Sequence, residues 1–238
     1  MNPKKNNMED HDYKVIVRQV NRPNADIVSR IAALRREIVF DYIGENGLLD
    51  PKISSLLNHN WSFAGPAVTV NLTSPDILMP ACAITLCQPG DVIFVSVNGE
   101  TQASVWGGAL SISAKASQVA GIVIDGAVRS AESLIRSGVP VFCRTRQPKG
   151  APCDGSGSIN IPIKCGNTII NPGDIILGNL DGICVVPSEK ASQVLKECEE
   201  KNAAVSERAD RLKQGRVSLF EELNGPELLK NADVSWRD

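Results

Sequence analysis

The amino-acid sequence predicts an α/β fold, and three observations support this prediction. Short β-branched runs bounded by turn residues recur between Gly65 and Pro187, which is typical of strands. Two short amphipathic segments, 108–119 and 130–137, interrupt these runs where helices would cross between strands. An apolar stripe at helical spacing precedes the strands, and a long charged segment follows them. Strands that alternate with helices indicate a mixed core with helical additions at both ends.

The first helix is expected from Asn24 onward. Apolar residues recur there at spacings close to one helical face, at Ile27, Ile31, Leu34, Ile38 and Ile43. Asn24 or Asp26 is available as the N-cap, because either side chain can accept a hydrogen bond from a free N–H group of the first turn. Gly44 and Gly47 then end the periodic stretch.

Seven runs are expected to be strands: 66–72, 91–97, 121–126, 139–144, 167–170, 174–178 and 183–187. A Pro-Gly-Asp turn leads into two of them, at 88–93 and at 171–176. Proline presets φ at the second turn position and glycine tolerates positive φ at the third, so each motif predicts a tight turn that opens a strand.

The chain divides into three parts on these patterns. Residues 1–13 are polar and lack periodicity, which predicts a disordered leader. Residues 14–190 are expected to form one domain. Residues 191–238 are rich in Lys, Glu, Ala and Leu, and they predict a C-terminal helical arm that packs on a neighbouring subunit or on its own domain.

The composition narrows the classes of partner. The chain has 238 residues, of which 42% are hydrophobic, enough for a sizeable core. Its 25 Lys and Arg nearly balance 27 Asp and Glu, so nucleic acid and membrane surfaces are disfavoured partners. No stretch approaches the length of a membrane-spanning helix and the start lacks an apolar signal core, so a cytoplasmic location is expected. The seven cysteines contain no C-x-x-C pair and are expected to be reduced and mostly buried.

A glycine-rich segment, 98–110, is the first candidate for a binding site. It follows an apolar strand and ends in two consecutive glycines, Gly107 and Gly108, at the start of a predicted helix. There the N–H groups of Gly108, Ala109 and Leu110 would face a small carboxylate, assisted by the helix dipole. The alternative is that the glycines only permit a tight strand-to-helix turn.

Arg129 is the second candidate. It follows the buried strand 121–128, at the carboxyl end where open α/β folds bind ligands. Its planar guanidinium suits a carboxylate or a 2-oxo acid. The alternative is a structural ion pair with Asp125 or Glu132.

The remaining candidates have competing interpretations. His11 and His59 have no neighbouring ligand pattern and are expected at the surface. Trp106 either roofs the ligand pocket or packs over exposed backbone. The basic segment 144–150 either attracts a dianionic substrate or is a solvated loop.

Several of these motifs, taken in order, carry a resemblance. The blocks are 65–70 (GPAVTV), 89–91 (PGD), 106–108 (WGG), 125–129 (DGAVR), 140–142 (PVF), 172–174 (PGD) and 181–187 (DGICVVP). Over about residues 24 to 190 the sequence resembles the family of 4-hydroxy-4-methyl-2-oxoglutarate aldolase and regulator of ribonuclease activity A. Seven short blocks in the same order make chance resemblance a poor explanation.

The resemblance implies a three-layer β/β/α domain of the swivelling type, assembled as homotrimers or homohexamers. It implies a lyase, namely a class II (divalent-metal) pyruvate aldolase that cleaves 4-hydroxy-4-methyl-2-oxoglutarate or related acids and also acts as an oxaloacetate decarboxylase, with active sites between subunits. In such enzymes a divalent metal, magnesium or manganese, holds the 2-oxo acid product as its enolate.

Carried over by position, the substrate loop of the family falls on Gly107, Gly108, Ala109 and Leu110, and its substrate arginine on Arg129. Arg129 and Gly108 are thereby the implied catalytic positions. The metal-binding aspartate of the family is replaced by Ser130, whose neutral hydroxyl binds hard cations weakly.

A second departure concerns the acidic residue that the aldolases commonly carry after the first glycine of the loop. Here that position is Gly108. Glu100, Asp125 or a residue of an adjacent subunit are candidates for the missing carboxylate, with Glu100 ranked first because it begins the same loop. Glu100 is also a candidate metal ligand beside Ser130, and its alternative role is that of a solvated turn residue.

These departures leave two alternatives beside the metal-assisted lyase. One is a non-catalytic binding protein, similar to the ribonuclease regulators of the family. The other is a metal-independent lyase with an altered substrate, in which Ser130 hydrogen-bonds the ligand.

Overall fold

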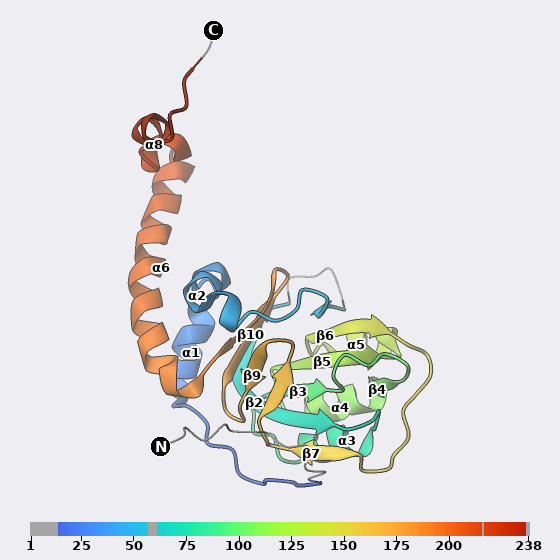
Figure 1. Cartoon of the computed structure of the whole chain (residues 1–238). Coiled ribbons are helices and arrows are strands. Elements are labelled where there is room, and N and C mark those ends of the chain that lie inside the picture. Colours follow the sequence, from blue (N-terminus) through green and yellow to red (C-terminus); the bar gives the residue numbers. More distant parts are fainter. Residues whose placement is uncertain (1–13, 57–60, 216, 237–238) are drawn as a thin grey trace, which may run out of the picture.

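The structure is a computed structural model that describes residues 14–56, 61–215 and 217–236 (Figure 1). The predicted leader 1–13, with His11, lies outside the described residues, and so does His59. Within the described ranges, no helix combines the length and the apolar character needed to cross a bilayer.

A mixed sheet forms the centre of the domain. In the described part of the chain it has nine strands, in the order β1-β6-β5-β3-β2-β10-β11, with β4 paired to β5 and β7 to β2. Strands β2, β3, β5 and β6 run parallel, as the helical connections predict. The strands are β1 (Ser54–Ser55), β2 (Phe63–Leu72), β3 (Val92–Ser96), β4 (Ser104–Trp106), β5 (Gly121–Val128), β6 (Val141–Arg146), β7 (Gly157–Ile159), β10 (Ile175–Asn179) and β11 (Gly182–Val186).

Helices α3 (Leu78–Ile84), α4 (Gly108–Ala116) and α5 (Ala131–Ser137) cover one face of the sheet (Figure 1). The hairpin of β8 (Ile163–Cys165) and β9 (Thr168–Ile170) covers part of the other face. Alternate residues of β2 serve the two cores: Val68 and Val70 pack toward the helices, whereas Ala67 packs on the hairpin side. The architecture is therefore β/β/α in three layers, which confirms the expected fold class.

All seven predicted strands are present, but α3 and the short strands β1, β4, β7 and β8 escaped prediction. Each of these strands is two or three residues long, which is too short for alternation to be recognised. Helix α3 has seven residues and contains Pro80, which obscures a helical pattern. The missed β4 matters most, because it leads directly into the glycine loop.

The single helix predicted after Asn24 is wrong in one respect: it is two helices, α1 (Ala25–Ala33) and α2 (Arg36–Ile43), followed by the short helix η1 (Gly44–Asn46). The backbone becomes extended between α1 and α2. There Nη1 of Arg36 donates to the carbonyls of Ala32 at 2.9 Å and Leu34 at 3.0 Å. In a continuous helix, these carbonyls would accept hydrogen bonds from backbone N–H groups. The side chain of Arg36 replaces those donors and thereby stabilises the break. Asn24 is the N-cap and accepts from the N–H of Asp26 at 2.8 Å.

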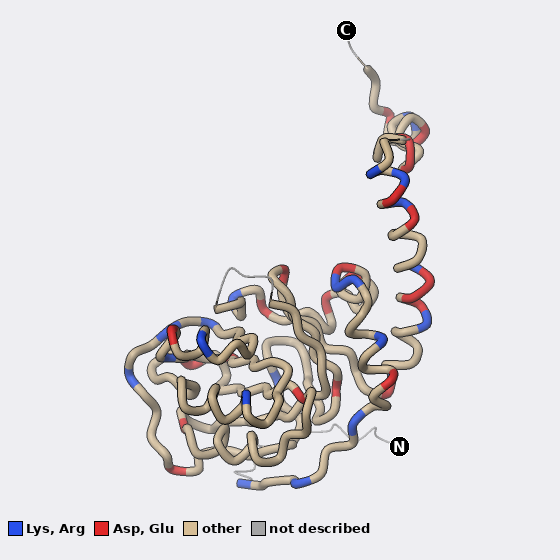
Figure 2. Tube along the Cα trace, turned by 180° about the vertical axis from the view of Figure 1, so that it is seen from behind, with Lys and Arg blue, Asp and Glu red and all other residues tan. Residues whose placement is uncertain are grey.

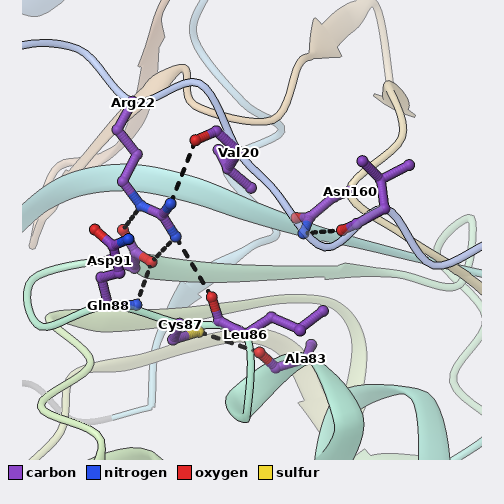
Figure 3. Close-up of polar contacts among 9 residues, drawn as sticks. Val20, Arg22, Ala83, Leu86, Cys87, Gln88, Asp91 and Asn160 are labelled. Atoms are coloured by element: carbon purple, nitrogen blue, oxygen red, sulfur yellow. Dashed lines mark hydrogen bonds and ion pairs between the residues drawn. The ribbon is translucent and has the colours of Figure 1, made fainter.

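Both Pro-Gly-Asp motifs form the predicted turns. Gly90 has φ 92° and Gly173 has φ 91°, and the N–H of the aspartate donates to the carbonyl three residues earlier in each turn. Asp91 is buried and is paired with Arg22 from the extended segment before α1 (Figure 3). The two hydrogen bonds are Nε to Oδ1 at 2.8 Å and Nη2 to Oδ2 at 2.6 Å, and they raise the pKa of Arg22. This pair ties the N-terminal segment to the turn that opens β3.

A long helix leaves the domain at its C-terminal end. After the short helix η2 (Ser188–Lys190), α6 (Ala191–Lys213) packs its first half on α1 and α2 around Val194 and Leu195. Its second half projects from the domain and carries α7 (Leu219–Glu222) and α8 (Gly225–Asn231) at its far end (Figure 1). Lys and Arg alternate with Asp and Glu along the projecting part, typical of a solvated helix face (Figure 2).

The cysteine thiols are free, as expected for a reduced set. Burial raises the pKa of Cys143 to about 11, and those of Cys87, Cys165 and Cys184 to about 12. These four thiols therefore stay protonated at neutral pH, which argues against a thiolate nucleophile among them.

Candidate functional site

The loop of the candidate site is held between β4 and β5. These strands pair in parallel, and the N–H of Arg129 donates to the carbonyl of Trp106 at 3.0 Å, just beyond the paired residues. Trp106 is almost entirely buried, and its indole Nε1 donates to Oγ of Ser111 on α4 at 2.8 Å. Both interpretations of Trp106 hold in part, because the side chain is buried in the core and also lines the cavity described below. The indole fastens the end of β4 to α4, and this contact fixes the loop between them.

Helix α4 begins immediately after Gly107, which has extended backbone angles. Its first internal hydrogen bond runs from the N–H of Ser111 to the carbonyl of Gly107 at 3.1 Å. Among the described residues, no hydrogen bond uses the N–H groups of Gly108, Ala109 or Leu110. Three donors at the positive end of a nine-residue helix therefore remain available to an anion.

Arg129 lies beside this helix start. A Cβ built on Gly107 would lie 3.4 Å from Cγ of Arg129, so the side chain passes directly over that glycine. A Cβ built on Gly150 would lie 2.6 Å from Cζ and 2.8 Å from Nη2 of Arg129, so the guanidinium rests against bare backbone. Within the described ranges the guanidinium makes no hydrogen bond or ion pair, and its donors are free for a ligand.

The expected alternative, an ion pair of Arg129 with Asp125 or Glu132, is wrong. The buried Asp125 instead pairs with Nε of Arg144, whose Nη1 also lies 2.7 Å from Oδ2 of Asp50. Glu132 lies 3.8 Å from Arg136 on its own helix. The pairing of β5 with β6 shifts register between Ile124 and Ala127, which is typical of a β-bulge next to a functional site.

Ser130 and Ser133 add hydroxyl groups to the site. Ser130 has left-handed backbone angles, φ 59° and ψ 45°, which cost a non-glycine residue about 1–3 kcal/mol. Within the described part of the chain its hydroxyl makes no hydrogen bond, whereas Oγ of Ser133 accepts one from Arg136 at 3.3 Å. A Cβ on Gly108 would lie only 2.8 Å from Cβ of Ser133. With α5 in this place, position 108 has no room for the acidic side chain that the family resemblance implies there.

These groups surround one open cavity of about 720 Å³. All four predicted loop residues, Gly107 to Leu110, line it together with Arg129 and Ser130. The other lining residues are Trp106, which one interpretation of the sequence placed over the pocket, and Ile77, Ser104, Ile112, Ser133 and Pro148. Pro148 belongs to the basic segment 144–150, and it is the only residue of that segment in the described lining, so the cations that one interpretation of the segment required do not line the cavity.

Among the described residues, the cavity offers no ligand set for a divalent metal. The described lining contains no carboxylate, imidazole or thiol, and Glu100 is not part of it. Asp125 is engaged by Arg144, as described above. Across the described residues, no group of three or more His, Cys, Asp or Glu side chains is placed to hold an ion. Magnesium prefers anionic oxygen ligands, which serine hydroxyls beside a guanidinium do not provide.

Comparison with known proteins identifies the family. A family profile described as RraA-like, Aldolase/RraA, matches residues 25–185. A protein of Halalkalibacterium halodurans, provisionally named 4-hydroxy-4-methyl-2-oxoglutarate aldolase, is 37% identical over 147 residues, which cover 62% of this chain and 70% of that protein.

Solved structures agree with this assignment. The RNA-processing inhibitor RraA from Thermus thermophilis superposes with a TM-score of 0.60 at 26% identity, covering 64% of this chain and 92% of that one. Streptomyces coelicolor RraAS2, described as an unusual member of the RNase ES inhibitor RraA family, shares the fold with a TM-score of 0.69 at 24% identity, covering 82% and 100%. The sequence resemblance is thereby confirmed, and the chain belongs to the RraA-like family, Aldolase/RraA.

Proposed function

We propose that this chain is a lyase that cleaves a carbon–carbon bond in a small 2-oxo acid. The observation that supports this most directly is the free guanidinium of Arg129 beside the free N–H groups of Gly108, Ala109 and Leu110 on one cavity. The relative named as an aldolase supports the same class of reaction. The candidate reactions are aldol cleavage of acids similar to 4-hydroxy-4-methyl-2-oxoglutarate and decarboxylation of oxaloacetate.

In this proposal the N–H groups of α4 hold the 1-carboxylate of the substrate, with the helix dipole adding a favourable potential. Arg129 donates to the 2-oxo oxygen, where negative charge grows as the bond from C3 to C4 breaks. The electron pair of that bond moves toward C3 and forms the enolate of pyruvate, which then takes a proton from water. In aldol cleavage the C4 hydroxyl loses its proton to water and C4 becomes a carbonyl carbon. In decarboxylation the departing group is carbon dioxide.

The divalent metal that the family resemblance implies does not fit the described lining, for the reasons given above. The proposal therefore includes no step that depends on a metal. The charge of the enolate is assigned to Arg129 and to the N–H groups of α4, with the hydroxyl of Ser130 available as a further donor. This is the metal-independent lyase that the sequence left open.

The test is pyruvate formation by the purified chain from oxaloacetate and from a panel of 4-hydroxy-2-oxo acids, coupled to lactate dehydrogenase. We expect a rate of pyruvate formation above the protein-free background. Because no step of the proposed mechanism uses a metal, this rate should differ by less than about twofold between excess EDTA and added magnesium or manganese. A rate abolished by EDTA and restored by manganese would contradict the metal-independent mechanism. A flat trace under every condition would contradict the lyase itself.

A second candidate function is a non-catalytic partner of a ribonuclease. The likeness to the RNA-processing inhibitor from Thermus thermophilis favours it. This function would be favoured over the lyase by two results together. No acid of the panel would give pyruvate, and the unaltered chain and its Arg129→Ala variant would retain a ribonuclease from lysate equally well.

We also propose that the chain forms a homotrimer or homohexamer. The projecting arm exposes large apolar side chains at its far end, at Leu219, Phe220, Leu223 and Leu228, which burial between copies would stabilise. Sedimentation equilibrium of the full chain is expected to give a trimeric or hexameric mass. The double variant Leu223→Lys, Leu228→Lys is expected to shift this mass downward, because a charged group is costly to bury. A monomer at all concentrations would contradict the proposal.

A further inference from the structure

A buried carboxylate adjoins the cavity wall, and the proposed reaction does not use it. Asp76 lies between β2 and α3, next to the cavity-lining Ile77, and it is 0% exposed. Among residues 14–56, 61–215 and 217–236 it makes no ion pair, and its oxygens accept hydrogen bonds from three backbone N–H groups. A buried charge without a cation depends on such donors, so Asp76 is bound firmly to the backbone around it.

The two oxygens of Asp76 join two segments that are distant in the chain. Oδ1 accepts from the N–H of Met79 at 2.8 Å and thereby satisfies a donor at the start of α3. Oδ2 accepts from the N–H groups of Asp154 at 2.6 Å and of Gly155 at 2.8 Å. The carboxylate therefore fastens the connection between β6 and β7 to the start of α3.

This connection also supports Arg129. It passes beside β4 and reaches the start of α3 (Figure 1). Gly150, in its first half, lies against the guanidinium of Arg129. The carbonyl of Pro152 accepts from the N–H of Ile77 at 2.9 Å, directly beside the contacts of Asp76. The guanidinium thus rests on a stretch of backbone whose far end is held by Asp76.

The backbone under the guanidinium is fixed at two places. Gly150 pairs with Ser104 of β4, and Asp76 holds the same connection further along, at residues 154 and 155. Catalysis is sensitive to such placement, since a group misplaced by about 1 Å can cost about 10²-fold in rate. All of these contacts are made within one chain, so they do not depend on whether a second copy adjoins the cavity.

We infer that Asp76 is a positioning residue, which holds the guanidinium of Arg129 in place through the connection between β6 and β7. This inference rests on the proposed function, in which Arg129 donates to the 2-oxo oxygen of the substrate. Asp76 itself is outside the described lining and acts on the reaction only through Arg129.

The variant Asp76→Asn removes one acceptor and leaves the size of the side chain unchanged. Its NH2 group would face backbone N–H groups instead of accepting from them, so one of the two segments loses its acceptor. We expect kcat/KM for pyruvate formation to fall about tenfold, because a misplaced guanidinium donates less well to the developing oxyanion. Calorimetry with oxalate, a small dianion that resembles the enolate of pyruvate, is expected to show a severalfold higher Kd.

The decisive measurement repeats Asp76→Asn in the Arg129→Ala background. If Asp76 acts through Arg129, the second substitution changes neither kcat/KM nor the Kd for oxalate any further. A loss of folded protein would instead lower the rate by the same factor in both backgrounds and would leave the Kd for oxalate unchanged.

The matched control is Asp174→Asn. Asp174 is 1% exposed and accepts from the N–H groups of Asn171 at 2.8 Å and Ser188 at 2.9 Å, but no residue of its turn lines the cavity. We expect this variant to be less stable and to keep the Kd for oxalate of the unaltered chain. Equal increases of this Kd in the two variants, or additive losses of kcat/KM when Asp76→Asn is combined with Arg129→Ala, would overturn the inference while leaving the lyase intact.

The variant Gly155→Ala tests the same anchor from the other side and decides the inference if Asp76→Asn does not fold. Gly155 has φ 72°, which strains a residue that carries a Cβ, whereas the hydrogen bond from Met79 to Asp76 is not touched. We expect the same rise in the Kd for oxalate, and no further rise in the Arg129→Ala background.

Binding separates the inference from the lyase. If no acid gives pyruvate but the Kd for oxalate follows the expected pattern, the lyase fails and the positioning role stands. A Kd for oxalate that Gly155→Ala leaves unchanged would overturn the inference. An unaltered chain that binds no oxalate would overturn both.

Discussion

Replacing Arg129 with alanine is expected to lower kcat/KM for pyruvate formation by about 10²- to 10³-fold, the effect of removing one preorganised donor from a developing oxyanion. The free energy of unfolding should change little, because the guanidinium makes no hydrogen bond or ion pair with the described residues. Arg146→Ala is the matched control, since Arg146 ends the neighbouring strand β6 and is exposed outside the lining. An equal loss of kcat/KM in both variants would show that Arg129 acts only through its positive charge and not through a specific contact with the substrate.

The glycine beneath the guanidinium offers a second way to test the same geometry. Gly150 is held on both sides by β4, because the N–H of Ser104 donates to the carbonyl of Lys149 at 2.8 Å and the N–H of Ala151 donates to the carbonyl of Ser104 at 3.0 Å. In Gly150→Ala the new methyl group therefore displaces the flexible end of Arg129 instead of the backbone. We expect reduced kcat/KM in this variant and no further reduction when it is combined with Arg129→Ala. Additive losses in the double variant would contradict this coupling.

Replacing Arg22 with leucine is expected to lower the free energy of unfolding by about 3–5 kcal/mol, the cost of leaving one charge of a buried pair without its partner. The side chains of Arg22 and Asp91 are only 17% and 2% exposed. Without the guanidinium, the carboxylate of Asp91 keeps the N–H of Gln88, at 2.7 Å, but no cation (Figure 3). Urea denaturation followed by circular dichroism measures the change.

The matched control is Arg30→Leu. Arg30 binds Glu199 through the same two-pronged geometry, at 3.0 Å and 2.8 Å, but these side chains are 50% and 39% exposed. Water screens such a pair, so the expected loss of unfolding free energy is much smaller than for Arg22→Leu. If Arg22→Leu and Arg30→Leu cost the same, burial does not set the strength of the Arg22 pair. Adding Asp91→Asn to Arg22→Leu is expected to recover part of the loss, because the buried charge is then removed.

The sequence by itself determined the elements whose pattern is local. β-branched runs between turn signals marked the strands that build the sheet, and both Pro-Gly-Asp motifs gave the turns they predicted. The helix starts at Asn24 and Gly107 were also visible, because a cap or a pair of glycines is a signal carried by adjacent residues. The break between α1 and α2 was not visible, since it depends on where the side chain of Arg36 finds its acceptors.

The same distinction applies to the residues of the candidate site. The glycine loop and Arg129 could be selected from the sequence, because each adjoins an element whose end was already marked. The tertiary structure alone decided that Asp125 is engaged by Arg144, that Ser133 excludes a side chain at position 108, and that Gly150 lies against the guanidinium of Arg129. These facts depend on contacts between residues distant in the chain or on how helices pack. Periodicity and turn chemistry report only on neighbours in sequence, whereas the pairing of strands and the packing of helices decide which distant side chains meet.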